Sequence, residues 1–158
     1  MGLRDALLSF DGRLRRRSWW ILGILLGLVQ WIAEELTIAA LDPQSGSFAD
    51  PWAEPSPASV AIRVIAAVVF LWPNLALSVK RAHDRDHSGL PAAIVTVVVT
   101  AASLFVVDDP AGLAEWMIIG VLIAGLIWLV VVLGVLDGTP GPNRYGPSPK
   151  SGQRQGIA

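Results

Sequence analysis

Residues 113–136 read LAEWMIIGVLIAGLIWLVVVLGVL, and this stretch decides the fold. It contains no charged residue between Glu115 and Asp137. A helix that crosses the apolar core of a bilayer, about 30 Å thick, needs about 20 predominantly apolar residues. The stretch therefore predicts a membrane-spanning helix.

The composition extends this prediction to the whole chain. Of its 158 residues, 53% are hydrophobic and only 16% are charged, and the mean hydropathy is +0.56. A soluble domain of this size cannot hide so much apolar surface. The net charge of -1 excludes a strongly basic nucleic-acid-binding protein, and the lack of cysteine excludes disulfides, zinc fingers and thiol catalysis. We therefore expect contact with a lipid bilayer, no nucleic-acid partner and no cofactor.

Three further apolar segments have the length of membrane spans, and they lie at residues 19–41, 58–79 and 90–107. The last of them contains a valine-rich part that would suggest a strand in water. In lipid, however, an isolated strand leaves its backbone groups unpaired, which favours a helix. Together with residues 113–136, these segments predict an all-α integral membrane protein with four transmembrane helices.

The basic residues indicate the orientation of these helices. Of the 12 Lys and Arg residues, all except Arg63 lie before the first segment, between the second and third, or after the fourth. The connections 42–57 and 108–112 contain no Lys or Arg. Because basic loops stay on the inner side of a membrane, both termini are predicted to lie in the cytoplasm.

Three polar stretches on the predicted cytoplasmic side contain most of the remaining side chains that could take part in binding or catalysis. They read FDGRLRRRSWW at residues 10–20, KRAHDRDHSG at 80–89 and GTPGPNRYGP at 138–147. We expect the second to extend the second helix beyond the membrane. The third is rich in Gly and Pro, which favour turns over helix. We expect it to fold as a cap beneath the bundle and to contact the other two stretches, the alternative being a solvated tail.

In this order and spacing, the three stretches resemble the DUF805 family of small bacterial inner-membrane proteins. The family has an F-x-G-R segment that ends in aromatic residues, an R-x-H-D segment after a proline-containing helix, and a G-T-x-G-x-N-x-Y-G tail. The resemblance covers essentially the whole chain. It implies a four-helix domain over residues 1–149 in the cytoplasmic membrane of a bacterium, and it implies no known activity. Residues 150–158 are expected to form a mobile polar tail.

The candidate functional residues gather in these three stretches. Asp84 is the expected hub, because a carboxylate can accept paired hydrogen bonds from arginine. His83 and His87 are spaced i, i+4, but the neighbouring cations disfavour a metal site between them. The candidate cytoplasmic cluster comprises Arg13, Arg16, Arg17, Lys80, Arg81, His83, Asp84, Asn143, Arg144 and Tyr145.

Two features concern helix packing. Gly23 and Gly27 form a GxxxG pattern, which allows close approach of a second helix, either within the bundle or in a homo-oligomer. Pro73 is expected to kink the second helix. Its neighbour Asn74 needs a polar partner in lipid, which is either another helix or a polar cavity.

Three charges fall inside the outer parts of the first two helices. At 1.5 Å per residue, Glu34 and Arg63 lie about 10 and 8 Å from the predicted outer boundary. Consecutive antiparallel helices are usually neighbours. We therefore expect a structural ion pair between Arg63 and Glu34 or Glu35, the alternative being that the first helix ends near Glu35 and both acids face water.

Three classes of function are compatible with these patterns. The favoured class is a non-enzymatic membrane protein whose basic cytoplasmic face binds a protein partner or anionic lipid headgroups. The second is a small-solute transporter or channel that acts as an oligomer. The third is a membrane-embedded lipid-modifying enzyme that uses His83 and Asp84 as acid and base.

Overall fold

The computed structural model describes residues 2–44, 55–105 and 111–149, and all the elements in these ranges are helices. The predicted polar tail and most of the 42–57 connection lie outside the described residues. In chain order the elements are α1 (Leu3–Leu8), α2 (Arg16–Leu41), α3 (Pro57–Asp84), α4 (Leu90–Ser103), α5 (Leu113–Leu129) and the π-helix η1 (Val130–Val135).

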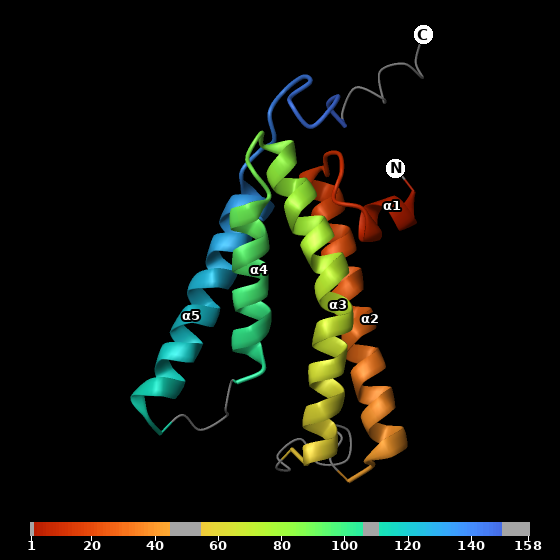
Figure 1. The fold of residues 1–158 in the computed structure, drawn as a ribbon, viewed down its shortest axis with the longest axis vertical. Coiled ribbons are helices and arrows are strands. Elements are labelled where there is room, and N and C mark those ends of the chain that lie inside the picture. Colours follow the sequence, from red (N-terminus) through yellow and green to blue (C-terminus); the bar gives the residue numbers. More distant parts are fainter. Residues whose placement is uncertain (1, 45–54, 106–110, 150–158) are drawn as a thin grey trace.

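Helices α2 to α5 form two antiparallel hairpins, α2 with α3 and α4 with α5 (Figure 1). The hairpins meet at the end of the bundle that carries α1, the turn after α3 and residues 138–149, which we call the polar end. They diverge toward the opposite end, which we call the open end.

Three of the helices are long and apolar enough to cross a membrane: Arg16–Leu41, Pro57–Asp84 and Leu113–Val135. At 1.5 Å per residue they are roughly 34–42 Å long. The helix predicted at residues 90–107 is shorter, because α4 ends at Ser103 and has 14 residues. It is roughly 21 Å long, less than the thickness of an apolar bilayer core. Residues 106 and 107 of that prediction lie outside the described ranges.

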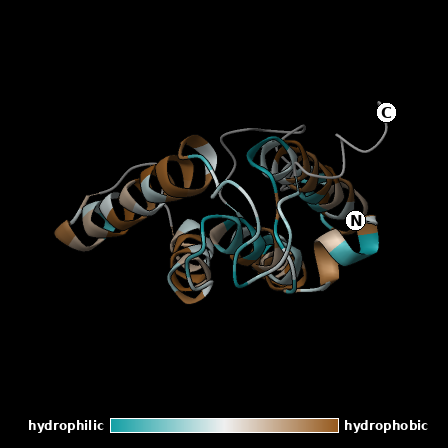
Figure 2. Ribbon diagram, turned by 90° about the horizontal axis from the view of Figure 1, so that it is seen from above, coloured by the Kyte–Doolittle hydropathy of each residue, from teal (hydrophilic) through white to brown (hydrophobic). Residues whose placement is uncertain are grey.

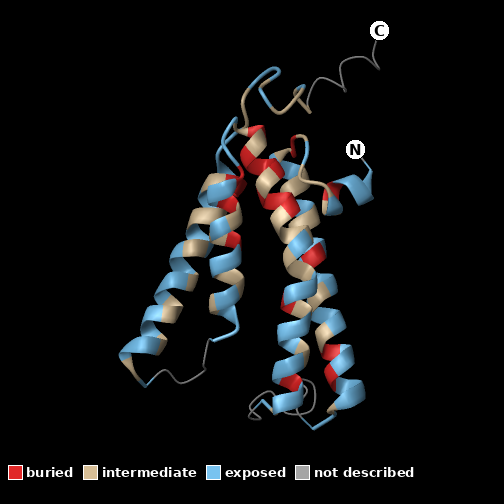
Figure 3. Cartoon of the chain, viewed as in Figure 1, coloured by how far each residue is buried: buried red, intermediate tan, exposed pale blue. Residues whose placement is uncertain are grey.

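Hydrophobic residues dominate the long helices (Figure 2), and many of them are exposed. Large aliphatic side chains such as Ile24, Val68 and Ile123 are more than half exposed, at 63%, 65% and 52%. Buried residues concentrate toward the polar end (Figure 3). A bundle with this surface matches lipid chains rather than water.

Local sequence explains where the helices begin. The hydroxyl of Ser56 accepts the N–H of Ser59, and Pro57 occupies the first turn of α3, as N-terminal capping favours. The carboxylate of Glu115 accepts the N–H of Gly112 at the start of α5 (2.8 Å). Helix α2 begins at Arg16, three residues before the predicted start, so part of the arginine stretch is helical.

Helix α3 continues through Pro73 as a single helix of 28 residues. Proline removes one backbone hydrogen bond from the helix. Beside it, the side-chain amide of Asn74 donates to the carbonyl of Phe70 one turn earlier (2.9 Å). Asn74 is therefore hydrogen-bonded within its own helix, and the size of a kink at this point stays a prediction.

The core near the polar end consists of two small clusters. One centres on Leu14, Leu26 and Leu77, and the other on Ala82, Ala92 and Leu133. Trp19 packs against both clusters, so the first residues of α2 tie the two hairpins together.

Gly23 and Gly27 do not mediate close packing among the described residues. A Cβ atom built on either glycine meets nothing within 4 Å. The close approach within the bundle that the GxxxG pattern allows is therefore absent from the described part of this chain. Homo-oligomerisation through these glycines stays a prediction.

Candidate functional site

Asp84, at the end of α3, lies between two arginine side chains at the polar end. Its Oδ1 accepts from Nε of Arg13 (3.1 Å) and its Oδ2 from Arg81. The side chains of Asp84, Arg13 and Arg81 are 7%, 2% and 0% exposed. Each carboxylate oxygen is thus paired with a buried guanidinium, which suits the hub position that the sequence predicts.

Arg13 connects Asp84 to the Gly/Pro-rich stretch at residues 138–147, which we call the cap. Its guanidinium donates to the carbonyls of Gly141 (2.7 Å), Thr139 (2.8 Å) and Gly146 (3.3 Å). The N–H of Thr139 in turn donates to the carbonyl of Asp84 (2.8 Å). Arg13 therefore fastens the cap to the end of α3.

The cap is a compact turn rather than an extended tail. The backbones of Asn143 and Gly146 exchange two hydrogen bonds of 3.0 Å. Gly141 and Gly146 have φ angles of 75° and 124°, which side chains with a Cβ rarely adopt. The amide of Asn143 reaches the carbonyl of His83 at the end of α3 (2.9 Å), so this part of the turn also contacts the helix.

Aromatic and charged contacts complete the docking of the cap. The ring of Tyr145 stacks on the imidazole of His83, with 3.8 Å between ring centroids and 6° between planes. Arg144 lies 5.0 Å from the Tyr145 ring centroid and forms an exposed ion pair with Asp86 (3.2 Å). His83 therefore acts as a packing surface for the cap in this conformation.

Gly138 marks the closest approach of the cap to α3. A Cβ built at this position would lie 2.6 Å from the carboxylate carbon of Asp84 and 2.9 Å from its carbonyl oxygen. Because backbone cannot move aside cheaply, a larger residue at this position would push the cap away from the helix.

The π-helix η1 ends in carbonyls that side chains satisfy. Arg81 donates to the carbonyls of Leu133 (2.7 Å) and Leu136, Trp20 to that of Gly134 (3.0 Å), and Arg16 to that of Val135 (2.8 Å). Terminal carbonyls of a helix lack partners within the helix, and these four receive theirs from α2 and α3. The aliphatic run at residues 129–136 carries no pattern that separates a π-helix from an α-helix, so the sequence did not predict it.

Helix α1 is a second element that was not predicted from the sequence. Nζ of the fully buried Lys80 donates to the carbonyls of Asp5 and Ala6 in the last turn of α1, both at 2.5 Å. A cation near the C-terminus of a helix is stabilising. The indole of Trp72 also donates to the carbonyl of Leu8 (3.2 Å). The i, i+3, i+4 spacing of Leu3, Ala6 and Leu7 was the available signal.

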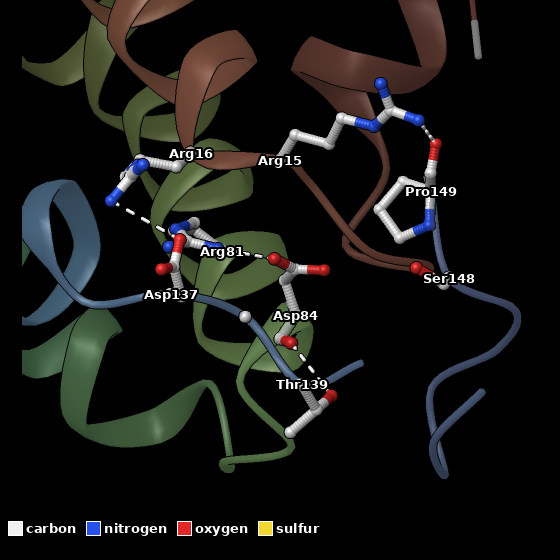
Figure 4. Close-up of a pocket in the computed structure, with 9 residues that line it drawn as sticks. Arg15, Arg16, Arg81, Asp84, Asp137, Thr139, Ser148 and Pro149 are labelled. Atoms are coloured by element: carbon white, nitrogen blue, oxygen red, sulfur yellow. Dashed lines mark hydrogen bonds and ion pairs between the residues drawn. The ribbon is translucent and has the colours of Figure 1, made fainter. Parts of the chain in front are cut away.

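A small cavity lies beside Asp84 (Figure 4). Its volume is about 30 Å³, which gives room for two or three water molecules at about 10–15 Å³ each. Arg16 reaches Asp137 across it (3.3 Å), and the guanidinium of Arg15 donates to the carbonyl of Pro149. The cavity belongs to the internal packing of the polar end and is too small for a lipid headgroup.

The remaining predicted residues lie away from the cap cluster. Arg17 is exposed on the first turn of α2. Glu34, Arg63 and Asn74 line a separate cavity toward the open end, where Glu34 accepts a hydrogen bond from Gln30 (2.8 Å). In the described part of the chain, no ion pair within 4.0 Å joins Arg63 to Glu34. Glu35 is buried in α2, at 5% exposure.

These features define a class of protein: an α-helical membrane protein in which residues 138–147 form a hydrogen-bonded cap at one end of the bundle. The chain belongs to the family described as "Protein of unknown function (DUF805)", whose model matches residues 7–147. The match extends from the end of α1 through the cap, so it includes all three polar stretches.

Two proteins of Escherichia coli strain K12 are similar to this chain over most of their length. The uncharacterized protein YiiR is 30% identical over 151 residues, covering 92% of this chain and 89% of YiiR. The inner membrane protein YhaH is 26% identical over 143 residues, covering 90% of this chain and 88% of YhaH. No solved structure matches the chain. The apolar helices and the inner-membrane relative support a location in a bacterial inner membrane.

Proposed function

We propose that the chain is a non-enzymatic inner-membrane protein that crosses the membrane four times and binds anionic lipid headgroups at its cytoplasmic face. In this proposal both termini and the cap lie in the cytoplasm. The observation that carries the proposal is the division of the basic residues at the polar end into a buried set and an exposed set.

The buried set serves the fold. Arg13, Lys80 and Arg81 are at most 7% exposed, and their donors are engaged by Asp84 and by backbone carbonyls. These cations are therefore not accessible to a lipid headgroup. The same pairing argues against an acid–base enzyme, because Asp84 is held by two arginines and His83 stacks on Tyr145.

The exposed set lies on α1, on the first turn of α2 and directly after α3. Arg4 and Arg17 are exposed and Arg85 is half-buried, and none of the three makes an ion pair with another described residue. They lie at the end of the bundle where the apolar helices end, which is the depth of lipid headgroups. Basic residues near an anionic surface contribute about 1 kcal/mol each to its attraction.

The arrangement of the hairpins supports four crossings. The end of α3 and the end of η1 both lie at the polar end. Between them, α4 leads away from the polar end and α5 leads back toward it. Helix α4 provides the outward run. Its short length is compatible with spanning, since a bilayer thins locally around a short apolar segment at a modest energetic cost.

Reporter fusions test the topology. A reporter that is active only in the cytoplasm should be active at the C-terminal Ala158 and inactive within the 42–57 connection, at Gly46. The reason is that loops rich in Lys and Arg stay on the cytoplasmic side of the membrane. Activity of both fusions on the same side would contradict the four-crossing proposal.

Lipid selectivity tests the headgroup proposal. The variant Arg4→Gln/Arg17→Gln/Arg85→Gln should bind phosphatidylglycerol more weakly, by about fivefold for each arginine at low salt, which is about 1 kcal/mol per residue. The measurement is the phosphatidylglycerol retained by full-length protein, by native mass spectrometry, after exchange into mixed-lipid nanodiscs at two ionic strengths. The difference should shrink at high salt because exposed charges are screened.

The matched control is Arg144→Gln. It also removes one exposed cation at the polar end, but this cation is already paired with Asp86. Equal lipid retention in the triple variant and the unaltered protein would refute headgroup binding by these arginines.

A further inference from the structure

A second polar feature lies among α2, α3 and α4, away from the cap. It is a cavity of about 290 Å³. This volume is close to the lower limit for small-molecule sites, which is about 300 Å³. Its polar lining is contributed by all three helices: Gln30, Glu34, Arg63, Asn74, Thr100 and Ser103. The cavity extends along α3 from Arg63 to Asn74, which is roughly 16 Å of helix.

The two charged residues of this cavity lie at matched depths. Glu34 is seven residues before the end of α2 at Leu41, and Arg63 is six residues after the start of α3 at Pro57. These separations are roughly 10 and 9 Å along antiparallel neighbouring helices. A carboxylate and a guanidinium thus line one cavity at one level of the proposed membrane.

The two charges are not paired with each other. The carboxylate of Glu34 accepts from the amide of Gln30 (2.8 Å). The guanidinium of Arg63 makes no hydrogen bond and no ion pair within the described ranges. A charge in apolar surroundings is costly unless an opposite charge compensates it. Both groups therefore have unused capacity for a ligand that carries two opposite charges.

We propose that this cavity binds a small zwitterion, with an oxyanion on Arg63 and an ammonium group on Glu34. Arginine binds phosphate and carboxylate in a two-pronged geometry, and a carboxylate is the natural partner of an amine. The side-chain oxygen of Asn74 remains available as an acceptor, because the amide nitrogen is the atom that donates to Phe70. This site goes beyond the headgroup proposal, since it uses none of the arginines around the cap.

The same chemistry has two sources, a free solute or the phosphate and amine of a phosphatidylethanolamine headgroup. Glu34 also lines an apolar groove of about 290 Å³ between α2 and α3, together with residues such as Ile65, Ala66 and Phe70. A lipid would place an acyl chain in this groove, whereas a free solute would leave it unused. The substitution Ala66→Trp fills the groove without changing either charge.

The test uses the full-length protein and two probes. Free phosphoethanolamine is titrated calorimetrically into the protein in detergent. The number of phosphatidylethanolamine molecules that the protein retains is measured by native mass spectrometry. We expect Arg63→Gln and Glu34→Gln each to weaken binding of the zwitterionic probe at least tenfold, and Arg63→Lys to restore part of the affinity. Arg144→Gln, at a residue outside the cavity that is already paired with Asp86, should leave it unchanged.

The outcomes separate the two sources and the two proposals. Binding of free phosphoethanolamine that survives Ala66→Trp supports a solute site, and loss of bound phosphatidylethanolamine in Ala66→Trp supports a lipid site. The absence of binding for both probes overturns the proposal, as does binding that is unchanged in Arg63→Gln. Circular dichroism and gel filtration of each variant confirm that it is folded, and none of these results depends on the arginines around the cap.

Discussion

Replacing Asp84 by asparagine is expected to lower the free energy of unfolding by about 3–5 kcal/mol. The substitution keeps the shape of the side chain and removes its charge. Arg13 and Arg81 are then left as buried cations without the carboxylate that both of them contact. Breaking a buried ion pair by removing one partner is costly because the other charge stays desolvated. Reversible unfolding of the purified protein in mixed micelles with increasing dodecyl sulfate measures the change.

The control for Asp84 is Asp86→Asn, two residues along the chain. Asp86 pairs with Arg144, but their side chains are 45% and 59% exposed. An exposed pair contributes at most about 1 kcal/mol. Similar effects of the two substitutions would contradict the assignment of Asp84 as the hub of the polar end.

Replacing Arg81 by methionine is the second substitution with a large expected effect, again about 3–5 kcal/mol of unfolding free energy. Methionine keeps much of the buried volume but donates no hydrogen bonds. The carbonyls of Leu133 and Leu136 and one oxygen of Asp84 then lose a donor. Each buried polar group that is left unsatisfied costs about 1–3 kcal/mol.

The control for Arg81 is Arg16→Met. Arg16 also donates to a carbonyl of the π-helix, that of Val135, but its side chain is 48% exposed and water can replace it. We expect a change of at most about 1 kcal/mol in the same unfolding measurement. If Arg81→Met unfolds at the same detergent fraction as Arg16→Met, the π-helix does not depend on the buried arginine.

The grouping of the three polar stretches could be predicted because it follows from topology. Consecutive antiparallel helices return residues 10–20, 80–89 and 138–147 to one end of the bundle. Asp84 was expected to be the hub because a carboxylate can accept paired hydrogen bonds from arginine, and in the structure it contacts Arg13 and Arg81. Which arginines are buried was not predictable, since Arg13 and Arg17 stand in one arginine-rich stretch and differ only in where the backbone turns.

Other features depend on contacts between distant parts of the chain. Helix α1 is stabilised by Lys80 and Trp72, 64 or more residues away, and its six residues are too few for a helix on their own. The π-helix depends on donors from α2 and α3 in the same way. The predicted pair of Arg63 with Glu34 or Glu35 rested on depth and on the adjacency of consecutive antiparallel helices, and neither determines the lateral distance between two side chains.

Cross-linking of the cap to α3 tests the central claim most directly, namely that residues 138–147 form a docked cap. The natural chain has no cysteine, so the variant His83→Cys/Tyr145→Cys carries the only thiols. The native rings stack with 3.8 Å between centroids. In native membranes, a short bifunctional thiol reagent should therefore link these two cysteines efficiently. It should not link Tyr145→Cys to Ser56→Cys at the open end. A docked cap would be contradicted if the cysteines at positions 83 and 145 both react with a monofunctional maleimide but are not cross-linked to each other.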